Sequence, residues 1–136
     1  MKEVSNKVIT GVSGKPFKIV SRDANEEVVW KDAEKQIPEL RDGHVKDILH
    51  LVMFNIDPKI LTRQDTIHIH RLYDQVDKSD GGILKIEDAE WDWLKKKLQA
   101  DEVGPKILGA NCYAVEECIR KYQEENEKGK EKTEAK

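Results

Sequence analysis

The sequence predicts an α+β fold in which a small N-terminal β-hairpin or three-stranded element packs on about four helices. Short β-rich runs on either side of a Gly/Pro turn occupy the beginning of the chain. From Gly43 onward, apolar residues instead recur with the period of an α-helix. With a length of 136 residues, the chain is bounded to one small domain.

The β-hairpin is predicted from two short runs, residues 8–12 (VITGV) and 17–20 (FKIV), which bracket the turn at 13–16 (SGKP). Residues 28–30 (VVW) are a candidate third strand. The following segment, 31–42, contains a proline and mixed charge, so it is expected to be a connector.

Two amphipathic helices are predicted next. The first spans residues 43–56 and ends at Asp57-Pro58. The second begins at Thr62, where residues 62–65 resemble a capping box with Asp in place of Glu, and continues to the glycine turn at 80–82. Their apolar faces, with two leucines of the third helix, form the predicted core: Val45, Ile48, Leu49, Val52, Ile56, Leu72, Tyr73, Val76, Leu94 and Leu98.

Residues 83–86 (ILKI) are expected to form a short strand, and a third helix starts at Glu87-Asp88. After Gly104-Pro105 a fourth helix carries an apolar stripe from Leu108 to Tyr122. We therefore expect a single α+β domain at 1–122. Residues 123–136 are charged and nearly free of apolar groups, so they are expected to form a disordered tail.

Composition excludes several classes of function. The net charge of −3 leaves no basic surplus for a phosphate backbone, so nucleic-acid binding is not expected. No apolar run is long enough to span a bilayer, and the first residues lack the apolar core of a signal peptide. Cys112 and Cys118 lack the Cys-x-x-Cys spacing of a redox or zinc site. We expect a soluble cytoplasmic protein with two reduced thiols.

The most specific local motif is the twelve-residue stretch 77–88 between two predicted helices. As an EF-hand loop it would offer Asp77, Ser79 and Asp88 as side-chain ligands for Ca²⁺, with Gly82 at the sixth position. Gly81 stands where an oxygen ligand is usual, and Asp88 is shorter than the usual Glu. A Gly-Gly turn without metal is the favoured interpretation, and the calcium site is the alternative.

No catalytic group is predicted, because no nucleophile, base and orienting residue can be named together. No cofactor is predicted either. The four histidines, His44, His50, His68 and His70, lack the His-x-x-x-His spacing with which a helix chelates a metal.

Trp91 and Trp93 lie about 200° apart on the third helix, so the core is expected to bury one of them, Trp91. Trp93 is then exposed beside Lys96 and Lys97. We predict that these three residues bind a protein partner or a second copy of the chain, because tryptophan is enriched among interface anchors.

The order of residues 43–49, 73–76, 84–91 and 94–98 resembles that of small bacteriophage and prophage proteins. Those proteins run strand, helix, polar linker, helix, short apolar strand, an acidic-start helix ending in lysines, and a last helix. The similarity covers residues 28–120 and is one of pattern. It implies a non-enzymatic protein-interaction or structural accessory domain. The single-site calcium-binding module remains the alternative.

Overall fold

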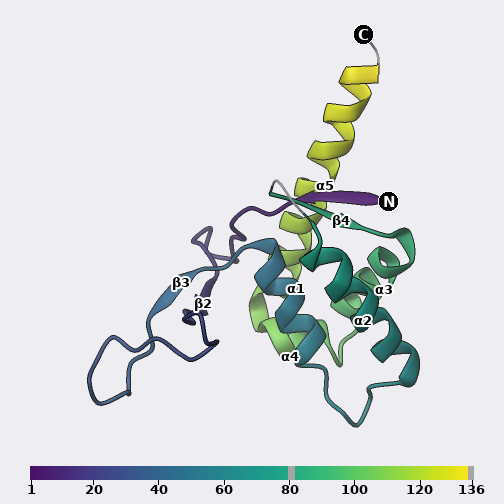
Figure 1. Cartoon of the computed structure of the whole chain (residues 1–136). Coiled ribbons are helices and arrows are strands. Elements are labelled where there is room, and N and C mark those ends of the chain that lie inside the picture. Colours follow the sequence, from purple (N-terminus) through teal and green to yellow (C-terminus); the bar gives the residue numbers. More distant parts are fainter. Residues whose placement is uncertain (80–81, 135–136) are drawn as a thin grey trace.

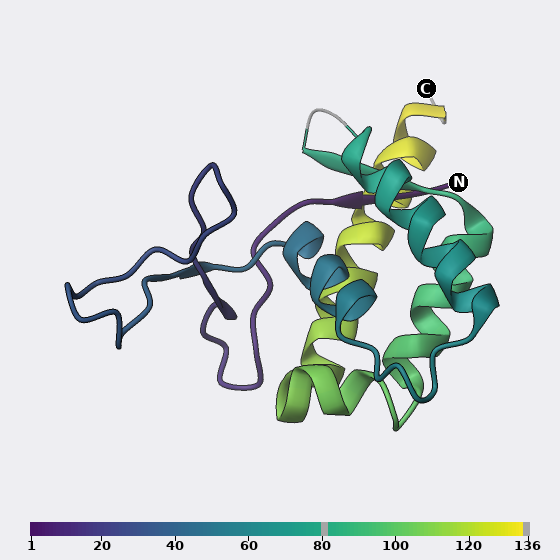
Figure 2. The same cartoon turned by 60° about the horizontal axis from the view of Figure 1, so that its bottom comes forward.

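The structure is a computed structural model that describes residues 1–79 and 82–134, with side chains described as far as Lys128. A helical body is crossed by a two-stranded ribbon, and an arm, residues 17–42, projects from one side of the body (Figures 1 and 2). In chain order the elements are β1 (Lys2–Ser5), β2 (Lys18–Val20), β3 (Leu40–Asp42), α1 (Val45–Phe54), α2 (Arg63–Asp77), β4 (Ile83–Ile86), α3 (Asp88–Gln99), α4 (Gly104–Leu108) and α5 (Cys112–Glu134). The predicted α+β class is confirmed.

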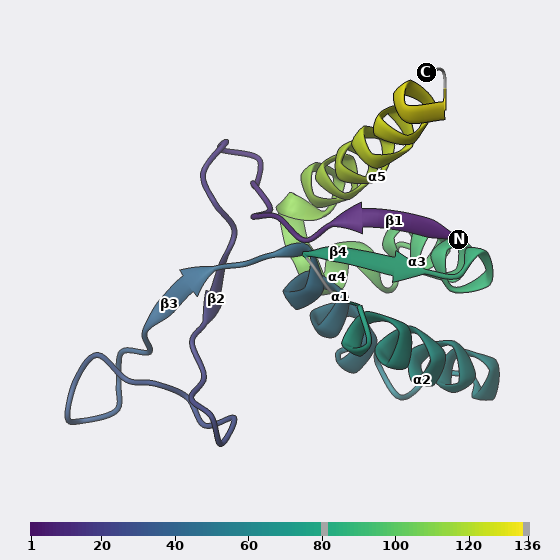
Figure 3. The same cartoon turned by 45° about the horizontal axis from the view of Figure 1, so that its top comes forward.

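The ribbon pairs two segments that lie far apart in the sequence. β1 and β4 are antiparallel, with Val4 opposite Leu84. Both of these side chains are buried, because this face of the ribbon lies on the helices. β1 packs against α5, and β4 packs against α2 (Figure 3). The strand predicted at residues 83–86 is confirmed, and its partner is the extreme N-terminal segment.

α1 and α2 begin with side chains that satisfy backbone amides of the first turn. Thr62 Oγ1 accepts a hydrogen bond from the backbone N–H of Asp65 at 3.1 Å, and Asp65 Oδ2 accepts one from the N–H of Thr62 at 3.0 Å. The predicted capping box is thus confirmed with Asp in the third position. At α1, Asp47 Oδ2 likewise accepts a hydrogen bond from the backbone N–H of His44 at 2.9 Å.

The last predicted helix is divided in two. After α4, a 3₁₀ turn (Gly109–Asn111) leads into α5. Gly109 has a φ of +61°, in the left-handed region that favours glycine, so it ends α4. Gly104 allows α4 to approach the end of α3, since a Cβ there would lie 2.0 Å from the carbonyl oxygen of Leu98.

The arm takes the place of the predicted N-terminal hairpin. Around the Gly/Pro turn the backbone N–H of Phe17 donates to Ile9 O at 2.8 Å, but the ladder there consists of one isolated bridge. β2 pairs instead with β3, with Val20 opposite Leu40. The third predicted strand, residues 28–30, contributes two isolated bridges. The predicted pairing of the two runs is therefore limited to the residues next to the turn, and residues 18–20 pair with a segment about 20 residues further along the chain.

The core forms where the helical stripes predict it, with one exception. The buried members of the predicted set are Val45, Ile48, Leu49, Val52, Ile56, Leu72, Val76, Leu94 and Leu98. Tyr73 is 43% exposed, because its ring stands beside the exposed ring of Phe54 instead of entering the core.

α5 continues through Glu134, whereas the sequence predicts that the ordered domain ends at Tyr122. Gln123 is buried, and Asn126 Nδ2 donates a hydrogen bond to Ser5 Oγ in β1 at 2.9 Å. Glu127 pairs with Lys2 at 3.3 Å. These residues are polar, so they dock on β1 through hydrogen bonds and ion pairs that an apolar pattern does not reveal. Residues 135–136 of the predicted tail lie outside the described residues.

Candidate protein-binding surface

The three residues predicted to bind a partner do not share an exposed face. Trp93 is 7% exposed, and its Nε1 donates a hydrogen bond to Asp65 Oδ1 at 3.0 Å. Lys97 Nζ lies 3.0 Å from the same oxygen, whereas Lys96 is exposed. The prediction of Trp93 as an exposed anchor is therefore wrong. α3 is in contact with both α2 and α5, so it buries Trp91 and Trp93 together.

Asp65 is a buried carboxylate surrounded by donors. Burial alone would raise its pKa. Hydrogen bonds from Trp93, from the backbone N–H of Thr62 and from Lys97 outweigh this effect and lower the pKa of Asp65 to about 2. Because hydrogen bonds to the charged form favour it, the carboxylate remains ionised at neutral pH.

A second buried carboxylate, Glu90, also joins α3 to α2. Its Oε1 accepts a hydrogen bond from Gln75 Nε2 at 2.8 Å, and its Oε2 lies 3.2 Å from His68 Nδ1. The His68 ring stacks on Trp93 with 6.0 Å between ring centroids. Asp65 and Glu90 are thus bonded to groups of the protein itself, and neither lines the grooves described below. We interpret Asp65 and Glu90 as polar contacts that hold α3 against α2.

The calcium alternative needs Asp77, Ser79 and Asp88 to converge. The Ser79 hydroxyl donates to Gln75 O at 2.8 Å and accepts a backbone N–H from β4 at 2.9 Å. Asp88 Oδ1 lies 3.1 Å from the terminal ammonium of Met1. Loop positions 80 and 81 lie outside the described residues. In the remainder, no three His, Cys, Asp or Glu side chains are grouped to hold an ion. Two of the three predicted ligands are thus engaged elsewhere.

Both cysteines are free, as predicted. Burial, and then the charge of Glu116, raises the pKa of the Cys112 thiol, which donates to Leu98 O at 3.3 Å. Cys118 Sγ lies 3.3 Å from Thr10 Oγ1. A thiol with a raised pKa is a weak nucleophile, so Cys112 is placed as a core residue.

The arm and α1 enclose an open groove of about 600 Å³, which we call the arm groove. The arm supplies one wall with Ile19, Val20 and Leu40, and α1 supplies the other with Leu51 and Phe54. Leu40 is 48% exposed and Phe54 is 61% exposed. The groove therefore presents large apolar side chains to solvent on both walls.

An aromatic cluster continues the arm groove across α1 to α2. The rings of His50 and Phe54 have centroids 6.1 Å apart, and the His50 ring stacks on Tyr73 at 5.5 Å. Burial, and then the charge of Lys46, lowers the pKa of His50, so this ring is neutral at pH 7. The cluster thus adds apolar and aromatic area to the groove without adding charge.

Sequence reasoning missed this surface, although one signal was present. Phe54 does not fall at one of the positions that form the apolar stripe of α1, and its side chain is exposed. A large aromatic residue off the stripe indicates an exposed apolar contact. Leu40 gave no comparable signal, because its position on the arm depends on the long-range pairing of β3 with β2.

None of the helices in residues 1–79 and 82–134 combines the length and the apolar character that a bilayer crossing needs. No protein-family model, no curated protein and no solved structure matches this chain.

Proposed function

We propose that this protein is a non-enzymatic protein-interaction domain. Its docking surface is the arm face, which comprises the exposed apolar side chains of the arm, the outer end of α1 and the neighbouring edge of α2. These side chains are Trp30, Ile37, Leu40, Phe54 and Tyr73.

The observation that carries this proposal is that most of the exposed large apolar side chains lie on the arm or in the aromatic cluster beside the arm groove. Among the described residues, eight large apolar side chains are exposed, and five of them belong to the arm face. The other three, Met1, Val12 and Tyr113, lie on other parts of the chain. Leu40 and Phe54 line the same groove, and Tyr73 adjoins Phe54. Contiguous exposed apolar area of this kind marks interaction sites, whereas single exposed side chains are ordinary.

The architecture of the arm favours a second copy of the chain as the partner. β2 and β3 have three residues each, and an isolated two-stranded sheet is marginally stable in water unless another layer covers it. A second arm would supply that layer, since a twofold dimer uses the same face on both subunits. The arm carries five basic and seven acidic residues, so both signs of charge are available for ion pairs between two arms.

Light scattering over a range of concentrations tests this proposal. We expect the parent to approach twice its 15.7 kDa mass at high concentration. Phe54→Ser and Leu40→Ser should each weaken the dimer by about tenfold or more, because each removes exposed apolar area from the arm face. Circular dichroism should show an unchanged fold, since both side chains are exposed.

Tyr113→Ser is the matched control. Tyr113 is 71% exposed and aromatic, but it lies on α5, outside the arm face. It should leave self-association unchanged. A parent that stays monomeric up to about 1 mM would contradict the proposal. An equal loss of association in the Tyr113 variant would contradict it as well.

A further inference from the structure

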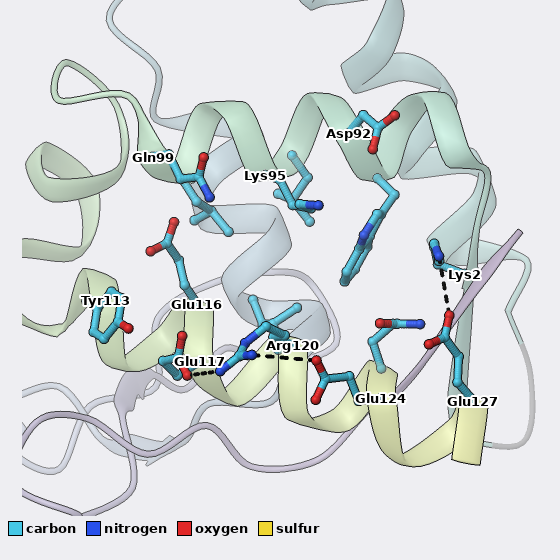
Figure 4. A pocket seen from close by; sticks show the side chains of 15 residues that line it. Lys2, Asp92, Lys95, Gln99, Tyr113, Glu116, Glu117, Arg120, Glu124 and Glu127 are labelled. Atoms are coloured by element: carbon cyan, nitrogen blue, oxygen red, sulfur yellow. Dashed lines mark hydrogen bonds and ion pairs between the residues drawn. The ribbon is translucent and has the colours of Figure 1, made fainter. Parts of the chain in front are cut away.

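A second groove, of about 400 Å³, lies between α3 and α5, and we call it the α3–α5 groove (Figure 4). None of its lining residues belongs to the arm or to the arm groove. Its floor is apolar and is formed by Trp91, Leu94, Leu98 and Ile119. The walls above the floor are polar and charged. A concave site with an apolar floor and a few directed polar groups is the usual form of a ligand site.

Gln123 supplies the polar group that the fold leaves unused. This side chain lines the groove and is 6% exposed, and its Nε2 donates to no group in the described structure. Leaving a buried donor unsatisfied destabilises the folded state, because the donor loses its hydrogen bond to water on folding. Native structures satisfy nearly all such groups, so a hydrogen-bond acceptor is missing at this position.

The charges of the groove are partly paired. Arg120 contacts Glu117 and lies 3.6 Å from Glu124, and Lys2 lies 3.3 Å from Glu127 (Figure 4). Among the described residues, these contacts leave one cation, Lys95 on α3, and two carboxylates, Asp92 on α3 and Glu116 on α5, without an ion-pair partner, so the groove keeps an excess of negative charge.

Of the two carboxylates, Glu116 would be stabilised more by an incoming cation. It extends from α5 toward Gln99 on α3 (Figure 4). Burial, and then the charge of Glu117, raises the pKa of Glu116. A half-buried carboxylate without a partner gains more from an incoming cation than one that is already paired.

The distance between Glu116 and Gln123 determines which ligand could contact both side chains. Glu116 and Gln123 are seven positions apart on α5, which places them on one face, two turns or about 10 Å apart. An extended peptide advances about 3.3 Å per residue, so three residues cover this distance. A basic side chain at one end and a backbone carbonyl at the other supply the missing cation and the missing acceptor.

We propose that the α3–α5 groove binds a short extended peptide segment, which places a lysine or arginine side chain against Glu116 and a backbone carbonyl oxygen against the Gln123 carboxamide, whose covered NH₂ group turns into the groove when the peptide binds. A neighbouring apolar side chain of the peptide contacts the floor near Ile119. This interaction is separate from self-association through the arm face, and either one can fail without the other.

The test is an NMR titration of the full chain with the capped peptide acetyl-Arg-Leu-Ala-amide. We expect shifts of groove residues and of the Gln123 side-chain amide, with a dissociation constant of about 1 mM or lower. The same peptide with citrulline in place of arginine keeps the shape and loses the charge. It should bind at least about tenfold more weakly.

Three variants complete the test. Glu116→Gln should weaken binding at least about tenfold, and Gln123→Met should weaken it severalfold without lowering stability, because the lost amide had no partner in the protein. Glu125→Gln makes the same charge change on α5 outside the groove and should have no effect. Equal binding of the citrulline peptide would overturn the proposal, and this comparison needs no variant. An equal loss in Glu125→Gln, or no groove shifts at about 10 mM peptide, would overturn it too.

Discussion

At the scale of single residues, the buried polar groups between α2 and α3 depend on partners from both helices. The helical period places Trp91 and Trp93 on opposed sides of α3, but it does not show how many neighbours cover the helix. α2 covers the second side, and Asp65 provides the acceptor that the buried indole N–H requires. Asp65 was identified as a capping residue from sequence. Its second role as the partner of Trp93 and Lys97 depends on tertiary contacts.

The buried Asp65 carboxylate predicts a dependence of stability on pH. Its pKa is about 2 in the folded protein, against about 3.9 for an unperturbed Asp in the unfolded chain. Its stabilisation of about 2–3 kcal/mol is therefore complete above the unfolded value and is lost as the pH falls from about 4 toward 2. Asp65→Asn lacks this titration, so the stability difference between parent and variant should shrink over the same range.

Urea denaturation of both proteins between about pH 5 and pH 2 measures this difference. His44→Gln is a suitable control, since His44 is partly exposed and contributes no carboxylate. A stability difference between parent and Asp65→Asn that is constant with pH would show that Asp65 is not held ionised by its neighbours.

At the scale of elements, the sequence predicted those segments whose structure is determined by local pattern. α1, α2 and β4 have a clear apolar period and recognisable ends, and all three form close to the expected residues. β2 and β3 have three residues each and pair over a distance of about 20 residues, so no local pattern marks them. The end of α5 was missed for a different reason, because its contacts with β1 are polar.

Truncation tests whether the segment after Tyr122 docks on the domain or is a disordered tail. Ending the chain after Tyr122 removes the buried Gln123 and the hydrogen bond from Asn126 to Ser5. We expect the melting temperature to fall by about 5 °C, since the lost contacts amount to about 1 kcal/mol or more. Ending the chain after Lys128 keeps these contacts and should lower the melting temperature less. Equal melting temperatures of the parent and the shorter chain would favour the disordered tail that the composition predicts.

At the scale of the whole molecule, a well-packed helical body carries a thin arm that has no second layer of its own. The body accounts for the buried core, whereas most of the exposed large apolar side chains lie on the arm or beside the arm groove. The lack of a recognisable catalytic set and the spacing of the two tryptophans favoured an interaction protein over an enzyme and pointed to α3, whose tryptophans are buried. The arm face replaces α3 as the expected interface. The resemblance to phage proteins stays a prediction, since the comparisons with known proteins neither support nor contradict it.

The most direct test of the arm face is isotope-filtered NMR on an equal mixture of ¹³C-labelled and unlabelled chains. If two copies associate through the arm face, NOEs between different chains should connect Trp30, Ile37 or Leu40 of one copy with Phe54 or Tyr73 of the other. They should disappear in Phe54→Ser and persist in Tyr113→Ser. Intermolecular NOEs confined to other surfaces, or none at about 1 mM, would contradict the assignment of the arm face as the docking surface.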